Sequence, residues 1–109
     1  MDEVINLFEQ YFVKHWFDNV MRSDRWIFRF ENNYGASIVK GPYSYGGKEG
    51  KYELGLIKFY SENPYDWKLY YDEYDAEPET YNKYCYCDVA GYLNISDIIN
   101  YLNDIKGRK

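Results

Sequence analysis

Residues 25–31 constrain the fold most, because large apolar side chains stand at every second position and Ile27 is the one apolar residue between them. Trp26, Phe28 and Phe30 fall on one side of an extended chain, and the residues between them fall on the other. This period of two indicates a half-buried strand. The next four residues, 32–35 (Asn-Asn-Tyr-Gly), are of the types that tolerate left-handed backbone, so they predict a turn.

Three or four more strands are expected after this turn. Residues 36–40 are predicted to pair with residues 25–31 as a hairpin. Residues 51–60 carry aliphatic side chains at both alternating positions, which indicates burial on both faces. A further strand is predicted at residues 66–73 and an edge-like one at residues 83–89.

Both ends of the chain show helical periodicity. Residues 2–21 follow the i, i+3, i+4 rule, and His15 falls on the apolar face of the helix that this predicts, where a core or rim histidine is the ordinary interpretation. At the other end, Asn94 or Ser96 is the expected N-cap of a helix, and Asn94 with Asp97 has the spacing of a capping box before an aliphatic stripe. Gly107 lies just beyond the stripe, as is typical of a helix C-terminus.

These elements predict a single α+β domain over residues 1–109. Its expected parts are an N-terminal helix, an antiparallel meander of four to five strands and a C-terminal helix, with both helices packed on one face of the sheet. No basic segment precedes an apolar run at the N-terminus, and no apolar stretch has the length that spans a bilayer. We therefore expect a cytoplasmic protein, in the host cell cytoplasm if a phage encodes it.

The charge balance limits the classes of partner. The chain has 18 acidic and 13 basic side chains and a net charge of −5. A general nucleic-acid binder needs a basic surface that displaces counterions, and an anionic membrane attracts basic segments, so we expect neither direct nucleic-acid binding nor membrane binding. The charge fits a protein partner with a basic surface, such as a nucleic-acid-binding enzyme.

Tyrosine is the most unusual component. Fifteen residues are tyrosine, and nine of them lie between Tyr60 and Tyr92, around an acidic run. Tyrosine gives large, rigid contact area at binding surfaces, and carboxylates attract basic partners. The expected charge contacts are Asp72, Glu73, Asp75, Glu77 and Glu79. The expected aromatic anchors are Tyr70, Tyr74 and Tyr81, with Tyr43 and Tyr45 in the glycine-rich residues 41–50 as a second patch.

Other interpretations of this tyrosine-rich, acidic region stay open. One is a solvated loop with an edge strand whose phenols cover the sheet. Another is a carbohydrate-binding module, in which aromatic rings stack on sugars and polar side chains bind the hydroxyl groups. Strand edges that carry tyrosines can also pair two copies of the chain, so a homodimer remains a candidate.

The sequence offers little for catalysis or metal binding. Cys85 and Cys87 form a C-x-C pair, and His15 is the one other soft ligand, which is fewer than the four that a structural zinc site needs. No nucleophile elbow, P-loop or dinucleotide motif is present. We therefore expect no enzymatic activity, no metal and no cofactor; an enzyme using Cys85 or Cys87 is the competing hypothesis.

Three segments carry a resemblance to a known group of proteins. They are residues 30–41 (FENNYGASIVKG), 52–57 (YELGLI) and 89–93 (VAGYL). In this order they resemble small, uncharacterised proteins of bacteriophages and mobile elements, although Asn33 stands where a glycine is usual. The resemblance brings no catalytic residues.

The phage-like resemblance implies a function. Small acidic domains of such origin include anti-CRISPR proteins, which inhibit host defence enzymes. We therefore expect a non-enzymatic inhibitor of a bacterial nucleic-acid-targeting defence complex, which occupies a basic nucleic-acid or target-recognition groove. An immunity protein for a nuclease toxin is the alternative within the same binding class.

Overall fold

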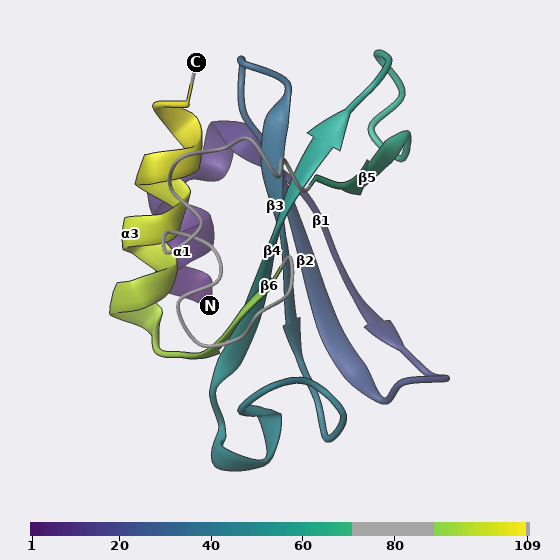
Figure 1. The fold of residues 1–109 in the computed structure, drawn as a ribbon, viewed down its shortest axis with the longest axis vertical. Coiled ribbons are helices and arrows are strands. Elements are labelled where there is room, and N and C mark those ends of the chain that lie inside the picture. The colour runs from purple at the N-terminus through teal and green to yellow at the C-terminus, as the bar shows by residue number, and fades with distance from the viewer. Residues whose placement is uncertain (71–88, 109) are drawn as a thin grey trace.

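The computed structural model describes residues 1–70 and 89–108, and in them the chain forms one antiparallel sheet with a helix near each end (Figure 1). In chain order the helices and 3-10 turns are α1 (Asp2–Leu7), η1 (Glu9–Tyr11), η2 (Gly47–Glu49) and α3 (Ile95–Lys106). The strands are β1 (Phe12–Asp18), β2 (Ser23–Arg29), β3 (Tyr34–Lys40), β4 (Tyr52–Phe59), β5 (Trp67–Leu69) and β6 (Val89–Leu93).

The sheet is a meander with one added strand. Strands β1 to β5 pair in sequence order, and β6 pairs with β4. The predicted α+β class with an antiparallel sheet and terminal helices is confirmed, with six strands in place of the expected four to five. In the β2–β3 hairpin Phe28 lies opposite Ala36, and Asn33 adopts a positive φ of 67° in the turn. Asparagine tolerates this left-handed conformation, which is why it can replace glycine there.

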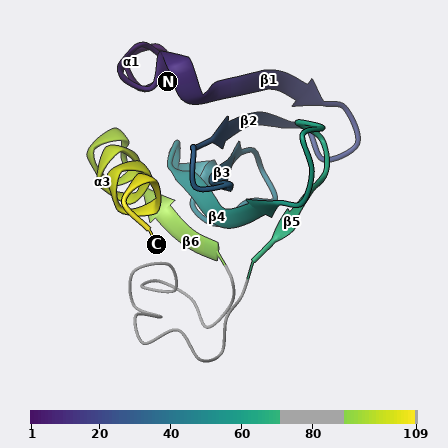
Figure 2. The same ribbon diagram turned by 90° about the horizontal axis from the view of Figure 1, so that it is seen from above.

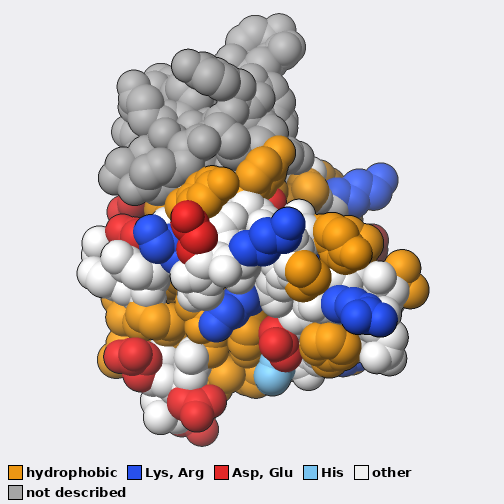
Figure 3. All heavy atoms as spheres, turned by 90° about the horizontal axis from the view of Figure 1, so that it is seen from below, with side chains coloured by type: hydrophobic (Ala, Val, Ile, Leu, Met, Phe, Trp, Pro, Cys, Tyr) orange, Lys and Arg blue, Asp and Glu red, His pale blue; other side chains and the backbone are white. Residues whose placement is uncertain are grey.

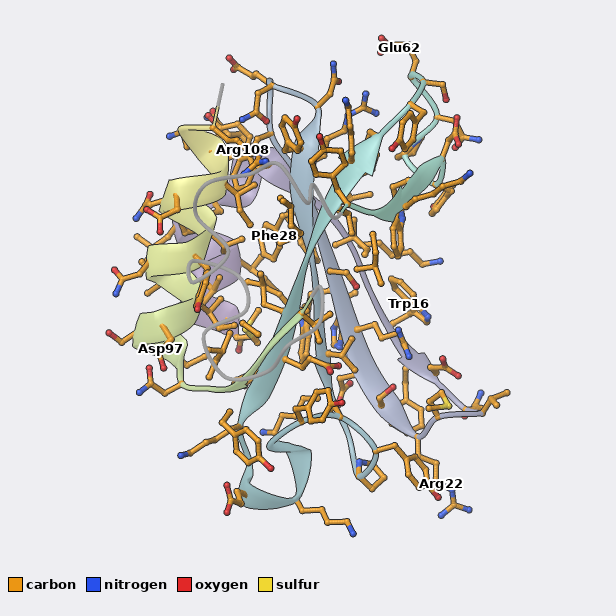
Figure 4. All side chains as sticks on the ribbon, in the orientation of Figure 1. Trp16, Arg22, Phe28, Glu62, Asp97 and Arg108 are labelled. Atoms are coloured by element: carbon orange, nitrogen blue, oxygen red, sulfur yellow. The ribbon has the colours of Figure 1, made fainter. Side chains whose placement is uncertain are left out.

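One face of the sheet carries the main core. Val4 of α1 and Ile98 of α3 are fully buried in the same cluster as Phe28 and Ile38 of the sheet. Phe28 packs edge-on against Phe8, with ring centroids 6.4 Å apart. In Figure 4 Phe28 lies between the sheet and the helices. Burial of these large apolar side chains is the dominant stabilising contribution to the fold.

Helix α3 is fixed at both ends by side chains. At its start Asn94 Oδ1 accepts from the Asp97 N–H at 2.9 Å, and Asp97 Oδ2 accepts from the Asn94 N–H at 3.0 Å, so the predicted capping box is confirmed. At its end Asn32 Nδ2 donates to the carbonyl oxygens of Ile105 and Arg108, at 2.8 Å each. These contacts satisfy backbone groups that a helix leaves unpaired at its ends.

The opposite face of the sheet holds a smaller core. Ile27, Ile57 and Phe59 are buried there, with Trp16 and Trp67 packed against them. The sheet curls, so that the β4–β5 turn approaches β1 (Figure 2). The contact between Lys14 Nζ and the ring of Tyr65, 5.3 Å from the centroid, joins these distant segments. The predicted alternation of Trp26, Phe28 and Phe30 against Ile27 is confirmed by this division between two clusters.

The helix expected over residues 2–21 is wrong beyond its first two turns. Helix α1 ends at Leu7, and residues 12–18 form β1. This segment contains three aromatic residues, which favour strands. Pairing with β2 satisfies its backbone hydrogen bonds, whereas a six-residue helix has little stability on its own. Val20, counted in the apolar stripe of the predicted helix, is 86% exposed.

The remaining strand predictions are confirmed in part. Strands β3 and β4 lie within a residue or two of the expected bounds, and Leu54 and Ile57 of β4 are buried on opposite faces. Strand β5 covers three residues of the expected 66–73. Of the expected strand 83–89, only Val89 lies within the described residues, where it begins β6. Within the described part of the chain, no helix has both the length and the apolar character needed to cross a membrane.

Candidate functional site

Strands β5 and β6 both pair with the same side of β4 and lie end to end along it, and together they form one strand row. The Tyr70 N–H donates to the Leu56 carbonyl at 2.8 Å, and Val89 is the partner of Gly55. Because both strands run antiparallel to β4, and Leu56 and Gly55 are neighbours, Tyr70 and Val89 are neighbours in the row. The two residues that flank residues 71–88 therefore occupy adjacent positions beside β4.

The inserted residues carry the net charge of the protein. Residues 71–88 contain six of the 18 acidic side chains, one of the 13 basic side chains and five tyrosines. The other 91 residues contain 12 acidic and 12 basic side chains, so they are neutral overall. The acidic character that predicted a basic partner thus belongs to an insertion within one strand row.

Tyr70, the predicted anchor at the start of this insertion, lies in a cluster of aromatic and cationic side chains. Its ring packs edge-on against Tyr34, with centroids 5.4 Å apart. Lys58 Nζ lies 5.3 Å from the centroid of Tyr70, 5.5 Å from that of Tyr34 and 5.9 Å from that of Tyr60. Arg108 lies over Tyr34 and Tyr70, at 5.0 and 5.7 Å. Attraction between cations and ring faces holds Tyr70 in place.

The second predicted patch is formed by the loop of residues 41–50. Tyr43 is 71% exposed and Tyr45 is 50% exposed. The Tyr45 carbonyl accepts from the Tyr92 N–H at 3.1 Å, and Tyr92 has a positive φ of 58° at an irregular position of β6. Gly91 lets Tyr45 approach the strand, because a Cβ there would collide with the Tyr45 side chain. This loop leads into the start of β4 (Figure 1), whereas Tyr70 lies beside Leu56, further along that strand.

A groove opens between this loop and the start of α1, with a volume of about 540 Å³. His15 Nε2 lies 3.1 Å from Asp24 Oδ1, and the His15 ring stacks on Trp26 with centroids 4.7 Å apart. On the other side, Lys40 Nζ lies 5.1 Å from the centroid of Tyr52. Figure 3 shows the single histidine beside an acidic side chain, with hydrophobic side chains around it.

The groove is lined by aromatic, basic and acidic side chains, among them Tyr52, Lys40 and the His15–Asp24 pair. Burial, followed by the nearby charges of Asp24 and Glu3, raises the pKa of Tyr52, so its phenol stays protonated and can donate a hydrogen bond. Among the described residues that line the groove there is no serine, threonine or cysteine that the His15–Asp24 pair could activate. The predicted position of His15 on a helix is wrong, because His15 lies on β1.

The other predicted site residues lie outside the described residues. They are Asp72, Glu73, Tyr74, Asp75, Glu77, Glu79 and Tyr81, and the same holds for Cys85 and Cys87. In residues 1–70 and 89–108, no three His, Cys, Asp or Glu side chains lie close enough together to hold a metal ion.

Sequence reasoning missed the groups that surround the predicted anchors. Lys58 and Arg108 meet at Tyr34 and Tyr70 although they come from β4 and the end of α3. The pairing of Asp24 with His15 depends on the register between β1 and β2. A helix over residues 2–21 has no such register, so the helix prediction could not include this pair. Residues 12–18 (FVKHWFD) do not alternate between apolar and polar side chains, so the sequence carries no period of two that would have indicated this strand.

Comparison with known proteins gives no match: no protein-family model, no curated protein and no solved structure is similar to this chain. The resemblance to phage proteins therefore stays a hypothesis that depends on the three segments quoted above.

Proposed function

We propose that this chain is a non-enzymatic, acidic binding protein, whose fold presents residues 71–88 to a protein partner with a basic surface. The observation that supports this most is the consecutive placement of Tyr70 and Val89 beside β4. A sheet that needs none of the inserted residues for its register leaves them available for binding. Charge supports it too, since this insertion carries the whole net charge of −5.

The partner class follows from charge and from the phage-like resemblance. A compact run of carboxylates can occupy a groove that binds phosphates, because the groove supplies lysine and arginine side chains at similar spacing. We propose a nucleic-acid-targeting defence complex of a bacterial host as the partner, and inhibition like that of anti-CRISPR proteins as the outcome. Asp72, Glu73, Asp75, Glu77 and Glu79 would make the charge contacts.

Tyrosines would anchor the complex. Tyr74 and Tyr81 lie within the insertion, and Tyr70 lies at its start, where Lys58 and Tyr34 already fix its ring. A side chain that is fixed before binding loses little conformational entropy on binding. Tyr43 and Tyr45 are exposed and would provide a second, separate contact.

The proposal is tested by affinity capture from a host lysate, with bound proteins identified by mass spectrometry. Wild-type chain is compared with a variant carrying Asp75→Lys, Glu77→Lys and Glu79→Lys. A control variant carries the same number of reversals outside the insertion, at the exposed residues Glu9, Glu49 and Asp104. We expect wild type and control to capture the same basic, nucleic-acid-binding protein, and the insertion variant to lose it.

Two further measurements separate the mechanisms. Binding of the captured protein should weaken steeply with salt, because screening acts over about 8 Å at physiological ionic strength. Added nucleic acid should compete with the chain for the captured protein. Equal capture by the insertion variant, or binding that nucleic acid leaves unchanged, would contradict the proposal. Capture of a nuclease toxin in place of a defence complex would favour the immunity-protein alternative.

A further inference from the structure

Strand β1 ends the sheet with an open edge. It pairs with β2 on one side, and Figure 2 shows no described element beyond it on the other. It contains no proline, and its one register irregularity lies at its beginning, between Phe12 and Lys14. Phe17 on this strand is 53% exposed. An open edge of seven residues with an exposed aromatic side chain is a template for pairing with another strand.

We propose that β1 pairs with β1 of a second copy of this chain, antiparallel and centred on Trp16. The proposal is independent of the function proposed for residues 71–88. In a symmetric dimer the two-fold axis is perpendicular to the sheet, so one residue must lie opposite itself. The middle of β1 offers three such centres, which are His15, Trp16 and Phe17.

Charge selects among these three registers. Centring on Trp16 places Lys14 opposite Asp18 of the second copy, and symmetry repeats this pair. Centring on His15 places Lys14 opposite Trp16 of the second copy, and centring on Phe17 places Asp18 opposite Trp16. Opposite charges across strands stabilise a sheet, whereas the other two registers leave both charges without a partner across the interface.

Both charged groups can make this contact, although Asp18 already has partners within its own chain. Among the described residues, no carboxylate lies within ion-pair distance of Lys14, whose ammonium group lies over the rings of Trp16 and Tyr65 at 5.1 and 5.3 Å. Asp18 Oδ1 accepts from two backbone N–H groups and Oδ2 lies 3.2 Å from Arg25 Nε. A carboxylate has about four acceptor positions, so Asp18 can accept one more donor.

Side chains on the other face agree with this register. His15 and Phe17 project from the helix-bearing face of β1, since His15 lies opposite the core residue Trp26. The register centred on Trp16 places each His15 opposite a Phe17, and aromatic pairs across strands add to sheet stability. The two Trp16 side chains meet at the axis on the opposite face. The charged pairs on one face and the aromatic pairs on the other face thus favour the same register.

Sedimentation velocity across a concentration series tests whether the dimer forms. We expect a monomer–dimer equilibrium for the full chain, weakened roughly tenfold by Lys14→Glu, which places like charges opposite each other twice. Lys51→Glu is the matched control, because Lys51 is exposed and precedes β4, away from β1. A chain that stays monomeric at every concentration, or equal effects of the two variants, would overturn the proposal.

A disulfide trap tests the register. In a background with Cys85→Ser and Cys87→Ser, Trp16→Cys should oxidise to a covalent dimer, because residues opposite each other have Cα atoms about 4.5–5.5 Å apart, within disulfide range. Lys14→Cys should stay monomeric on oxidation, since its two copies would lie about 13 Å apart along the strands. Equal cross-linking of both variants would exclude this register. The Lys14→Glu measurement decides the question if Trp16→Cys does not fold.

Discussion

Replacing Asn32 by alanine should be among the most damaging polar substitutions in this protein. Asn32 joins the β2–β3 turn to the end of α3. Its Nδ2 group donates to the carbonyls of Ile105 and Arg108 at 2.8 Å each, and to that of Lys106 at 3.3 Å. Its Oδ1 accepts from the Tyr34 N–H at 3.0 Å.

The magnitude follows from three short hydrogen bonds. Each contributes about 1 kcal/mol net, and the carbonyls at the helix end lose their partner, so Asn32→Ala should lower the free energy of unfolding by about 2–3 kcal/mol. With a urea dependence of about 1–3 kcal/mol per molar, the unfolding midpoint should fall by about 1 M. The free energy of unfolding of a small domain is about 5–15 kcal/mol in total, so a loss of this size is a large fraction of it.

Urea unfolding followed by circular dichroism provides the assay, and two variants sharpen it. Asn63→Ala is the control, because Asn63 is exposed and its side chain accepts one local hydrogen bond, from the Tyr65 N–H at 3.0 Å; we expect a loss below about 1 kcal/mol. Asn32→Asp should be at least as damaging as Asn32→Ala, since it places a negative charge at the negative end of α3. A loss for Asn32→Ala no larger than that for Asn63→Ala would refute the reasoning.

Three further predictions concern stability. Asn94→Ala removes half of the capping box of α3 and should cost about 1 kcal/mol in urea unfolding. Gly35→Ala should cost about 1–3 kcal/mol in the same assay, because a Cβ there would collide with the β2 backbone and lie 2.9 Å from the Phe59 ring. The Met21 N–H, which hydrogen-bonds Asp18, lowers the pKa of that carboxyl below its ordinary 3.8. Ionised Asp18 therefore stabilises the fold above pH 3.8, and this contribution is lost as the pH falls through the lowered pKa of the folded state. The stability difference between wild type and Asp18→Asn should thus be present at about pH 7 and shrink as the pH falls below 3.8, and a difference that stays the same down to about pH 2 would contradict the assignment.

Local signals account for what the sequence predicted correctly. Large apolar residues at every second position, such as Trp26 and Phe28, are sufficient to define a strand. The left-handed residue Asn33 is sufficient to define its turn. The capping residues Asn94 and Asp97 define the start of α3 in the same way. In each case the residues that decide the structure lie within a few positions of one another.

The errors arise where two periodicities compete. In residues 12–18, Phe12, His15 and Trp16 fit a helical stripe, yet the sheet places Trp16 and His15 on opposite faces. Because apolar residues occupy four of these seven positions, helical and strand patterns both find apolar matches. Pairing with β2, which is set by tertiary contacts, decides between them.

The candidate site could be predicted only in part, for a related reason. Tyr70, Tyr43 and Tyr45 were identified because tyrosine is unusual in such numbers. The cations that hold Tyr70, at Lys58 and Arg108, come from distant parts of the chain and leave no local signal. The continuity of β5 and β6 is equally hidden, because 18 residues separate two halves of one strand row.

Deletion of residues 71–88, with Tyr70 joined directly to Val89, tests the central claim most directly. If Tyr70 and Val89 are neighbours beside β4, the shortened chain should fold with an unchanged or higher urea midpoint, since the entropy cost of closing the chain between these two positions is removed. The same chain should fail to bind the protein that the full chain captures. Failure to fold would contradict the continuous strand row, and a folded chain that keeps full binding would contradict the role of residues 71–88.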